Sequence, residues 1–273
     1  MLGAEFCHTL TKAGARVVVA DLNAEAAKAL AASLNQRDDL TPQPPLGEAE
    51  RRPGGEVPCA LAVQTDVTSP ESVQQMVDAT LRTFGRLDIL VNSAALDPKF
   101  DPQHASSVSL HPSAFEQYPL DLWNQALAVN LTGMFLCCQS AVQPMLEQGK
   151  GVIVNVCSMY GLVGPDQRIY QREGQPPQYK PVYYSVTKAG VLGLTRYLAT
   201  YYAGKNIRVN ALTPGGVYNG HDEDFVQAYS ARAVLGRMAN KDEMNGALLF
   251  LASDASSYMT GANLVIDGGW TAW

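Results

Sequence analysis

The sequence predicts an α/β fold in which helices cover both faces of a doubly wound parallel sheet. Short apolar runs of strand length alternate along the chain with longer segments whose apolar residues recur at helical spacing. The short runs show little alternation between apolar and polar residues, as expected for strands that are buried on both faces. With 273 residues, of which 47% are hydrophobic, the chain can bury one full core, so we expect a single domain over residues 1–273.

The first third of the chain predicts two helices and two strands. Apolar residues at helical spacing indicate a helix over Met1–Ala13, and a β-branched run of strand length follows at Arg16–Asp21. A second helix is expected over Ala24–Leu34 and a second strand over Cys59–Gln64. Residues 35–57 are rich in proline, glycine and charge, which predicts a surface insertion.

The middle of the chain continues the alternation. Ser69 is a typical helix N-cap, with proline and glutamate in the turn after it, and the helix it starts extends to about Phe84. The apolar run Leu87–Asn92 predicts a strand, Leu120–Met145 a long amphipathic helix, and Gly151–Ser158 a fully buried strand.

The last third predicts two more helix–strand pairs. A helix is expected from Tyr183 to about Tyr202, followed by a strand over residues 206–212. A further helix is expected over about Lys241–Ser253 and a final strand over residues 262–267.

Two long polar loops leave the carboxyl ends of predicted strands. Residues 96–118 follow the strand Leu87–Asn92, and residues 159–182 follow the strand Gly151–Ser158. Ligands of open parallel sheets bind outside these ends, so both segments are expected to be substrate-side loops. Their Gln, Asp, Arg, His and Tyr residues favour a hydroxyl-rich substrate.

Composition argues against several classes of partner. A net charge of −6 and a pI of about 5.2, with no lysine or arginine run longer than two residues, argue against nucleic-acid binding. No uninterrupted apolar stretch has the length of a membrane span, and no signal-peptide pattern is present, so neither a membrane partner nor secretion is expected. The five cysteines lack CxxC spacing and the four histidines never pair at ligand spacing, which predicts reduced thiols, a cytoplasmic protein and no metal site.

The residues that directly follow the predicted strands are the candidates for a ligand site. They are Asp21, Asp66 and Val67, the segment from Asn92 through Ala94 to Ala95, Ser158, and the segment from Pro214 to Gly216. An acid that ends a strand, such as Asp21, can accept hydrogen bonds from ribose hydroxyls, although a strand-terminal turn aspartate is an equally common reading.

A tyrosine and a lysine four residues apart, Tyr184 and Lys188, lie near the start of a predicted helix on the ligand side of the sheet. Residues i and i+4 share one helix face, about 5–6 Å apart. A phenol needs a pKa shift of about 3 units to act as an acid or base near neutrality, and an ammonium nearby can supply most of it. Tyr201 and Lys205 repeat the spacing at the far end of the helix, where no ligand is expected.

Together these positions make the chain resemble the short-chain dehydrogenase/reductase family over essentially its whole length, with its Rossmann-type fold. Asn92-Ser-Ala-Ala95 corresponds to the family's NNAG, and NLVIDGG near the C-terminus also matches. The resemblance implies a catalytic set in which Tyr184 is the general acid/base and Lys188 lowers its pKa and holds the nicotinamide ribose. It further implies that Ser158 orients the substrate oxygen and that Asn130 positions a water that relays protons.

The resemblance also implies a bound nicotinamide dinucleotide. The residues that would contact it are Gly3, Asp21, Asp66, Val67, Asn92, Ala94, Tyr184, Lys188, Pro214, Gly215 and Val217. Because the charge of Asp21 would repel a 2′-phosphate, NAD is expected rather than NADP. In the family the helices that begin near Leu120 and Tyr183 commonly pair with their copies, so a homodimer or homotetramer is expected.

Three departures from the family pattern stand out. NSAA replaces NNAG, and the segment between Ser158 and Tyr184 is about twice the family's usual length. The family also has a strand and a glycine-rich loop before the first helix, where they hold the pyrophosphate. Here Gly3 corresponds to the last glycine of that loop. The first strand, which would lie between Arg16–Asp21 and Leu87–Asn92, is missing, and we expect the natural protein to begin about ten or more residues upstream of Met1.

The function expected from these residues is oxidation or reduction between a secondary alcohol and a ketone with NAD(H). The stretches around YSVTKAG, PGGVYN and DGGW resemble oxidoreductases of surface-sugar and flagellin-modification pathways, which favours a sugar- or polyol-like substrate. A 3-oxoacyl-type reductase is the alternative substrate class. The alternative class of function is that of a catalytically silent relative that uses the fold for binding or assembly, since the pyrophosphate loop is lacking. A serine hydrolase is excluded because GxSxG is absent.

Overall fold

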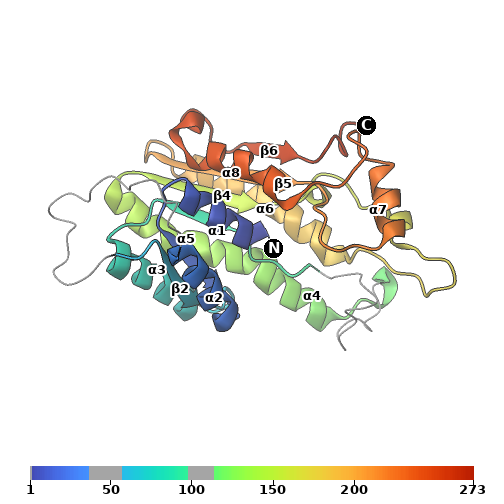
Figure 1. Ribbon diagram of the computed structural model, residues 1–273, viewed down its shortest axis with the longest axis horizontal. Coiled ribbons are helices and arrows are strands. Elements are labelled where there is room, and N and C mark those ends of the chain that lie inside the picture. Colours follow the sequence, from blue (N-terminus) through green and yellow to red (C-terminus); the bar gives the residue numbers. More distant parts are fainter. Residues whose placement is uncertain (1, 37–56, 98–113) are drawn as a thin grey trace.

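The protein is a single α/β domain with parallel strands, and its computed structural model describes residues 2–36, 57–97 and 114–273 (Figure 1). The strands are β1 (Val17–Asp21), β2 (Ala60–Gln64), β3 (Ile89–Asn92), β4 (Gly151–Val156), β5 (Ile207–Pro214) and β6 (Asn263–Ile266). The helices are α1 (Leu2–Lys12), α2 (Ala24–Asn35), α3 (Pro70–Phe84), α4 (Leu120–Leu127), α5 (Gly133–Gln148), α6 (Val182–Tyr201), α7 (Glu223–Ser230) and α8 (Asn245–Ala252).

Every strand predicted from the sequence is present, and all pair in parallel. One ladder joins β1 to β2, and a second sheet has the order β3-β4-β5-β6. Within the described residues no ladder joins β1 to β3, so the strands form two sheets. Most of the predicted insertion at residues 35–57, and residues 98–113 of the first substrate-side loop, lie outside the described residues.

Helices cover both faces of the larger sheet, as Figure 1 shows. On one face Met134 of α5 and Val191 of α6 pack with Ile153 and Val209 of the strands. On the other face, Phe6 of α1 and Leu248 of α8 form a buried cluster with the residues of β4 and β5 that point to that face. This double cover explains why the strands read as continuous apolar runs, and why β4 is buried at all six positions.

The local signals for one helix are confirmed in detail. The Ser69 side chain accepts a hydrogen bond from the backbone N–H of Ser72, with Pro70 in the first turn. The helix ends where Gly85 adopts φ 78°, a left-handed conformation that favours glycine. The predicted bounds of α3 are therefore correct at both ends.

The helix predicted over Leu120–Met145 differs from the expectation. It is continuous to Gln148, but residues Ala128–Thr132 form a π-helical segment between α4 and α5. By length and a mean hydropathy of 1.2, residues 120–148 form the one described helix that could cross a membrane. Contacts with α3, α6, β3 and β4 place this helix in the core of the domain.

Three further differences concern the second half of the chain. The helix predicted over about Lys241–Ser253 begins as a 3₁₀ turn and is α-helical only from Asn245. Two 3₁₀ turns, Met159–Gly161 and Gln167–Tyr170, lie within the predicted loop 159–182. The short helix α7 was not predicted, although Asp222 caps it through the backbone N–H of Phe225 at 3.0 Å.

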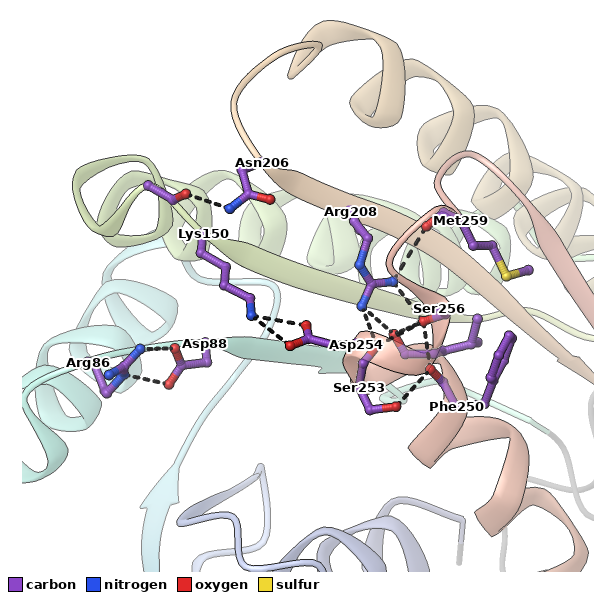
Figure 2. A network of polar contacts seen from close by, with 12 residues as sticks. Arg86, Asp88, Lys150, Asn206, Arg208, Phe250, Ser253, Asp254, Ser256 and Met259 are labelled. Atoms are coloured by element: carbon purple, nitrogen blue, oxygen red, sulfur yellow. Dashed lines mark hydrogen bonds and ion pairs between the residues drawn. The ribbon is translucent and has the colours of Figure 1, made fainter. Parts of the chain in front are cut away.

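The amino ends of the strands carry a separate polar network (Figure 2). Lys150 pairs with Asp254 at 3.0 Å, and both side chains are largely exposed. The Arg208 guanidinium donates to Ser256 Oγ at 2.9 Å and to carbonyl oxygens at the end of α8, including that of Ser253 at 2.9 Å. These contacts hold α8 against β5, so we infer that this end of the domain has a structural role.

Candidate active site

The carboxyl end of β4 and the start of α6 bring three of the predicted catalytic residues together. Ser158 lies two residues after β4, and Tyr184 and Lys188 lie in the first two turns of α6. A Cβ on Gly161 would lie 2.7 Å from the carbonyl carbon of Lys188, so the turn after Ser158 approaches α6 as closely as only glycine permits. This close packing fixes the serine opposite the tyrosine.

The tyrosine and lysine make specific contacts at this point. The Tyr184 hydroxyl is hydrogen-bonded to the Ser158 side chain. Lys188 is buried, its Nζ donates to the Val156 carbonyl oxygen at 2.9 Å, and the same nitrogen lies 5.8 Å from the centroid of the Tyr184 ring. The ammonium of Lys188 has three N–H donors. One of them bonds to the end of β4, and the side chain lies on the same face of α6 as Tyr184.

The pKa of Tyr184 is raised above its ordinary value, and the main cause is burial, which removes the water that would stabilise a phenolate. The nearby charge of Asp97 raises this pKa further, whereas the hydrogen bond from Ser158 lowers it. Burial also lowers the pKa of Lys188. Desolvation is the largest influence on Tyr184, whose raised pKa makes it a protonated phenol at neutral pH, and the lowering of this pKa by Lys188 stays a prediction.

Asn130 lies in the π-helical segment, and its side chain is engaged with protein. Its Oδ1 accepts from the backbone N–H of Leu96 at 2.6 Å, and its Nδ2 donates to the Leu96 carbonyl oxygen at 3.0 Å. Nδ2 also lies 3.4 Å from Thr187 Oγ1 on α6. The side-chain amide thus clamps the start of the first substrate-side loop, so a role in holding water would fall to the backbone of this segment.

Asn92 ends β3, and its side chain points into the core, so the contact expected with the cofactor falls to its backbone. Its Nδ2 donates to Asn155 Oδ1 at 2.9 Å, and Asn155 Nδ2 donates in turn to Thr195 Oγ1 at 3.0 Å. All three residues are buried, and Asn92 Nδ2 also contacts Cys138. Asn155 and Thr195 are not predictable from the sequence, because nothing local distinguishes a polar residue inside an apolar strand or helix.

Asp21 and Asp66 end β1 and β2 and lie near the surface. Asp21 is exposed, and one of its carboxylate oxygens accepts from the backbone N–H of Asn23 at 2.8 Å. Asp66 Oδ1 accepts from the N–H and the hydroxyl of Thr68, and these bonds lower the pKa of Asp66. Both residues therefore present oriented carboxylates at the carboxyl ends of their strands.

Between these acids and Tyr184 lies the start of α1. A Cβ on Gly3 would lie 3.7 Å from Ser93 Oγ, so the N-terminal turn of α1 faces the end of β3. Ala94, next to Ser93, is exposed. Val67 packs against Gly133, where a Cβ would meet Val67 Cγ2 at 2.7 Å. Gly3 and the residues after β3 are thus neighbours in space, and a helix N-terminus beside them suits a pyrophosphate.

The end of β5 closes the opposite side of the site. Pro214 is the last residue of the strand, and Gly215 donates its N–H to Ile266 of β6 at 2.9 Å. A Cβ on Gly215 would lie 2.7 Å from Asp267 Cα, which explains the glycine. Val217 is buried and forms a parallel bridge with Ala239.

These residues fit a nicotinamide dinucleotide. An exposed carboxylate (Asp21) ends β1, a helix N-terminus (Gly3) faces the end of β3, and an ammonium (Lys188) contacts the end of β4. Their acceptor, anion-binding and donor chemistry corresponds to an adenosine ribose, a pyrophosphate and a second ribose. For the residues that the structure describes, no group of three His, Cys, Asp or Glu side chains could hold a metal ion.

Ion pairs that the sequence analysis did not predict fasten the loop 159–182 to the elements around α7. Arg172 binds the Asp222 carboxylate through two nitrogens, at 2.9 and 2.8 Å. Asp166 contacts both Arg168 and Arg232, which hold its pKa at about 2. In Figure 1 this loop and α7 lie together beyond the carboxyl ends of β5 and β6, so they enclose the site from one side.

Comparisons with known proteins agree with this geometry. A family described as enoyl-(acyl carrier protein) reductase matches residues 48–271. D-threitol dehydrogenase from Mycolicibacterium smegmatis is 36% identical over 275 residues, covering 99% of this chain and 88% of the relative. A short-chain type dehydrogenase/reductase from Mycobacterium marinum has a TM-score of 0.76 at 29% identity, covering 100% of this chain and 91% of that one. A gluconate 5-dehydrogenase from Burkholderia cenocepacia, solved with NADP and tartrate, has a TM-score of 0.77 at 27% identity, with coverage of 100% and 92%.

Proposed function

The chain belongs to the short-chain dehydrogenase/reductase family, and from that premise we propose that it interconverts a secondary alcohol and a ketone with a nicotinamide cofactor. The observation that carries the proposal is the meeting of Ser158, Tyr184 and Lys188 at the carboxyl ends of the strands. The hydrogen bond between the Ser158 and Tyr184 side chains marks the place where a substrate oxygen would sit between two hydroxyls.

The proposed chemistry needs one proton and one hydride to move. A bound nicotinamide would accept the hydride from the carbinol carbon during oxidation or supply it during reduction. In the reducing direction the Tyr184 hydroxyl donates its proton to the carbonyl oxygen, which Ser158 orients. In the oxidising direction the same atom must accept the alcohol proton. Lys188 would bind the nicotinamide ribose and favour the phenolate that this step requires.

A polyol is the substrate class that we propose. Two similar proteins are named for polyhydroxylated substrates, threitol and gluconate. The loop 159–182 adds Gln, Arg and Tyr side chains around the site. A steady-state screen of polyols, simple secondary alcohols and 3-oxoacyl thioesters would test the class. Turnover of thioesters alone would favour the acyl-carrier alternative, and turnover of none would defeat the proposed function.

We predict that NAD is preferred to NADP. The exposed carboxylate of Asp21 would accept hydrogen bonds from the adenosine ribose and repel a 2′-phosphate. Replacing Asp21 with serine should reduce the preference by about tenfold or more, because the repulsion is removed while a hydroxyl remains. Calorimetric titration with both cofactors measures it, and equal affinities for the wild type would contradict the assignment.

We also predict a homodimer or homotetramer. Apolar side chains on α5 and α6 stay exposed in the single chain, with Phe135 at 45%, Tyr197 at 61% and Tyr201 at 65%. The other apolar residues of α5 are accounted for within the domain, since Met134 and Cys138 are buried. Tyr197 and Tyr201 stack with their ring centroids 5.7 Å apart, and exposed apolar residues that gather in this way are typical of an interface. Light scattering at micromolar concentration should report more than one chain, and a monomer would count against the prediction.

A further inference from the structure

A second lysine lies at the catalytic tyrosine, closer to its ring than Lys188. Lys180 ends the loop 159–182, two residues before α6, and its Nζ lies 4.0 Å from the centroid of the Tyr184 ring. The Lys180 side chain is only 9% exposed. Lysine is rarely buried without a charged partner. We therefore ask which group pairs with Lys180 beside the Tyr184 ring.

The partner of Lys180 comes from the other substrate-side loop. Its Nζ forms an ion pair with Asp97 Oδ1, across 83 positions of sequence. The two ends of the pair differ in exposure, because the Asp97 side chain is 52% exposed. The pair therefore presents a carboxylate to the outside and keeps its ammonium against the Tyr184 ring.

Both members of this pair are held from behind by side-chain amides. Gln167 accepts from the backbone N–H of Lys180 at 2.8 Å and donates to its carbonyl oxygen at 3.2 Å. Asn130 clamps Leu96, next to Asp97, in the same two-bond manner at 2.6 and 3.0 Å. Two independent amide clamps fix the two backbones, so the charged groups meet at a defined place beside Tyr184.

We propose that Lys180 and Asp97 form a substrate subsite that takes the hydroxyl adjacent to the reacting carbinol of a neutral polyol. This inference rests on the proposed function. A hydroxyl is both a donor and an acceptor, so it can accept from the ammonium of Lys180 and donate to the carboxylate of Asp97. Hydrogen bonds to charged groups are the stronger ones, which makes the pair selective for a second hydroxyl over hydrogen.

The same geometry disfavours an anionic substrate at this position. Asp97 already neutralises the charge of Lys180, and it is the exposed member of the pair. A substrate carboxylate would therefore approach a like charge before it could reach the ammonium. We accordingly expect neutral diols and polyols to be better substrates than hydroxy acids of the same length.

The test compares matched alcohols on two variants. Lys180→Met keeps a flexible unbranched side chain, one atom shorter, and removes its charge, and Asp97→Asn keeps the shape of the carboxylate. For each variant, the ratio of kcat/KM for butane-2,3-diol to kcat/KM for butan-2-ol should fall by about 10- to 100-fold, because any effect on Tyr184 acts on both alcohols alike. 3-Hydroxybutyrate should be a poor substrate of the wild type. In Asp97→Asn, its kcat/KM should rise relative to the kcat/KM for the diol.

Lys150→Met is the matched control. It breaks a Lys–Asp pair of the same kind with Asp254, at the amino ends of the strands and away from the site (Figure 2). Lys150→Met should leave kcat/KM unchanged for both alcohols. Thermal melting of all three variants separates a loss of fold from a loss of recognition, and Asp97→Asn serves if Lys180→Met does not fold.

The outcomes are separable. An equal fall for the diol and the mono-alcohol would overturn the subsite and make Lys180 a residue that positions Tyr184. No change for either alcohol would also overturn it. If the wild type oxidises no alcohol, the proposed function fails, and calorimetry with a tetritol still decides the subsite: binding by the wild type that Lys180→Met loses supports it, and absence of binding refutes it.

Discussion

Replacing Tyr184 with phenylalanine is expected to lower kcat/KM by about 10²–10⁴-fold, the usual contribution of a positioned general acid or base. The substitution removes the hydroxyl that is hydrogen-bonded to Ser158 and leaves the ring among its buried neighbours. The melting temperature should therefore change little. Steady-state kinetics on the best alcohol of the screen, with a melting curve on the same sample, measures both quantities.

Tyr201→Phe is the matched control for this prediction. Tyr201 has the same YxxxK spacing, with Lys205, but lies at the other end of α6, where it is 65% exposed and stacks on Tyr197 at 5.7 Å. Its loss should leave kcat/KM within about twofold, as for surface substitutions in general. Equal losses in Tyr184→Phe and Tyr201→Phe would refute the assignment.

The raised pKa of Tyr184 gives the reaction a direction-dependent pH profile. Burial favours the protonated phenol, which is the form that donates a proton to a carbonyl. Reduction should therefore stay active from pH 6 to 8. Oxidation needs the phenolate, whose fraction grows as pH rises toward the raised pKa, so its rate should increase from pH 7 to 10. An oxidation rate that falls over this interval in a folded sample would contradict the role of Tyr184.

The second large effect is expected at Asn155. Asn155→Ala should lower the free energy of unfolding by about 2–4 kcal/mol, because it removes, inside the core, the oxygen that accepts from the Asn92 amide and the N–H that donates to the Thr195 hydroxyl. The side chain is fully buried and joins β3, β4 and α6. Urea denaturation followed by circular dichroism measures the change.

Two comparisons identify the cause of that loss. Asn219→Ala, at an exposed asparagine, should change stability by less than about 0.5 kcal/mol. The double variant Asn92→Ala/Asn155→Ala should cost less than the sum of the two single variants, because it removes both partners of one hydrogen bond. Strict additivity would show that the loss comes from packing and not from the unpaired amide.

Local physical chemistry was sufficient to predict most of the secondary structure. Strands buried on both faces read as apolar runs, and Ser69 and the turn at Gly85 carry their signals within a few residues. The same holds for the position of Tyr184 and Lys188 on one helix face, since that depends only on the helical repeat. The helix α7 was missed because eight residues give too short a periodic pattern, although its Asp222 cap was visible.

Tertiary structure alone decided how these groups are tuned. The sequence places a lysine beside Tyr184, but it does not reveal that burial is the largest influence on the pKa of that tyrosine. Nor does it reveal that the fold turns the Asn92 side chain into the core and uses the Asn130 side chain as a clamp on Leu96. The pairing of Lys180 with Asp97 joins residues 83 positions apart, so no local pattern can encode it. Burial and long-range pairing depend on which segments meet in space, and those quantities set the electrostatics of the site.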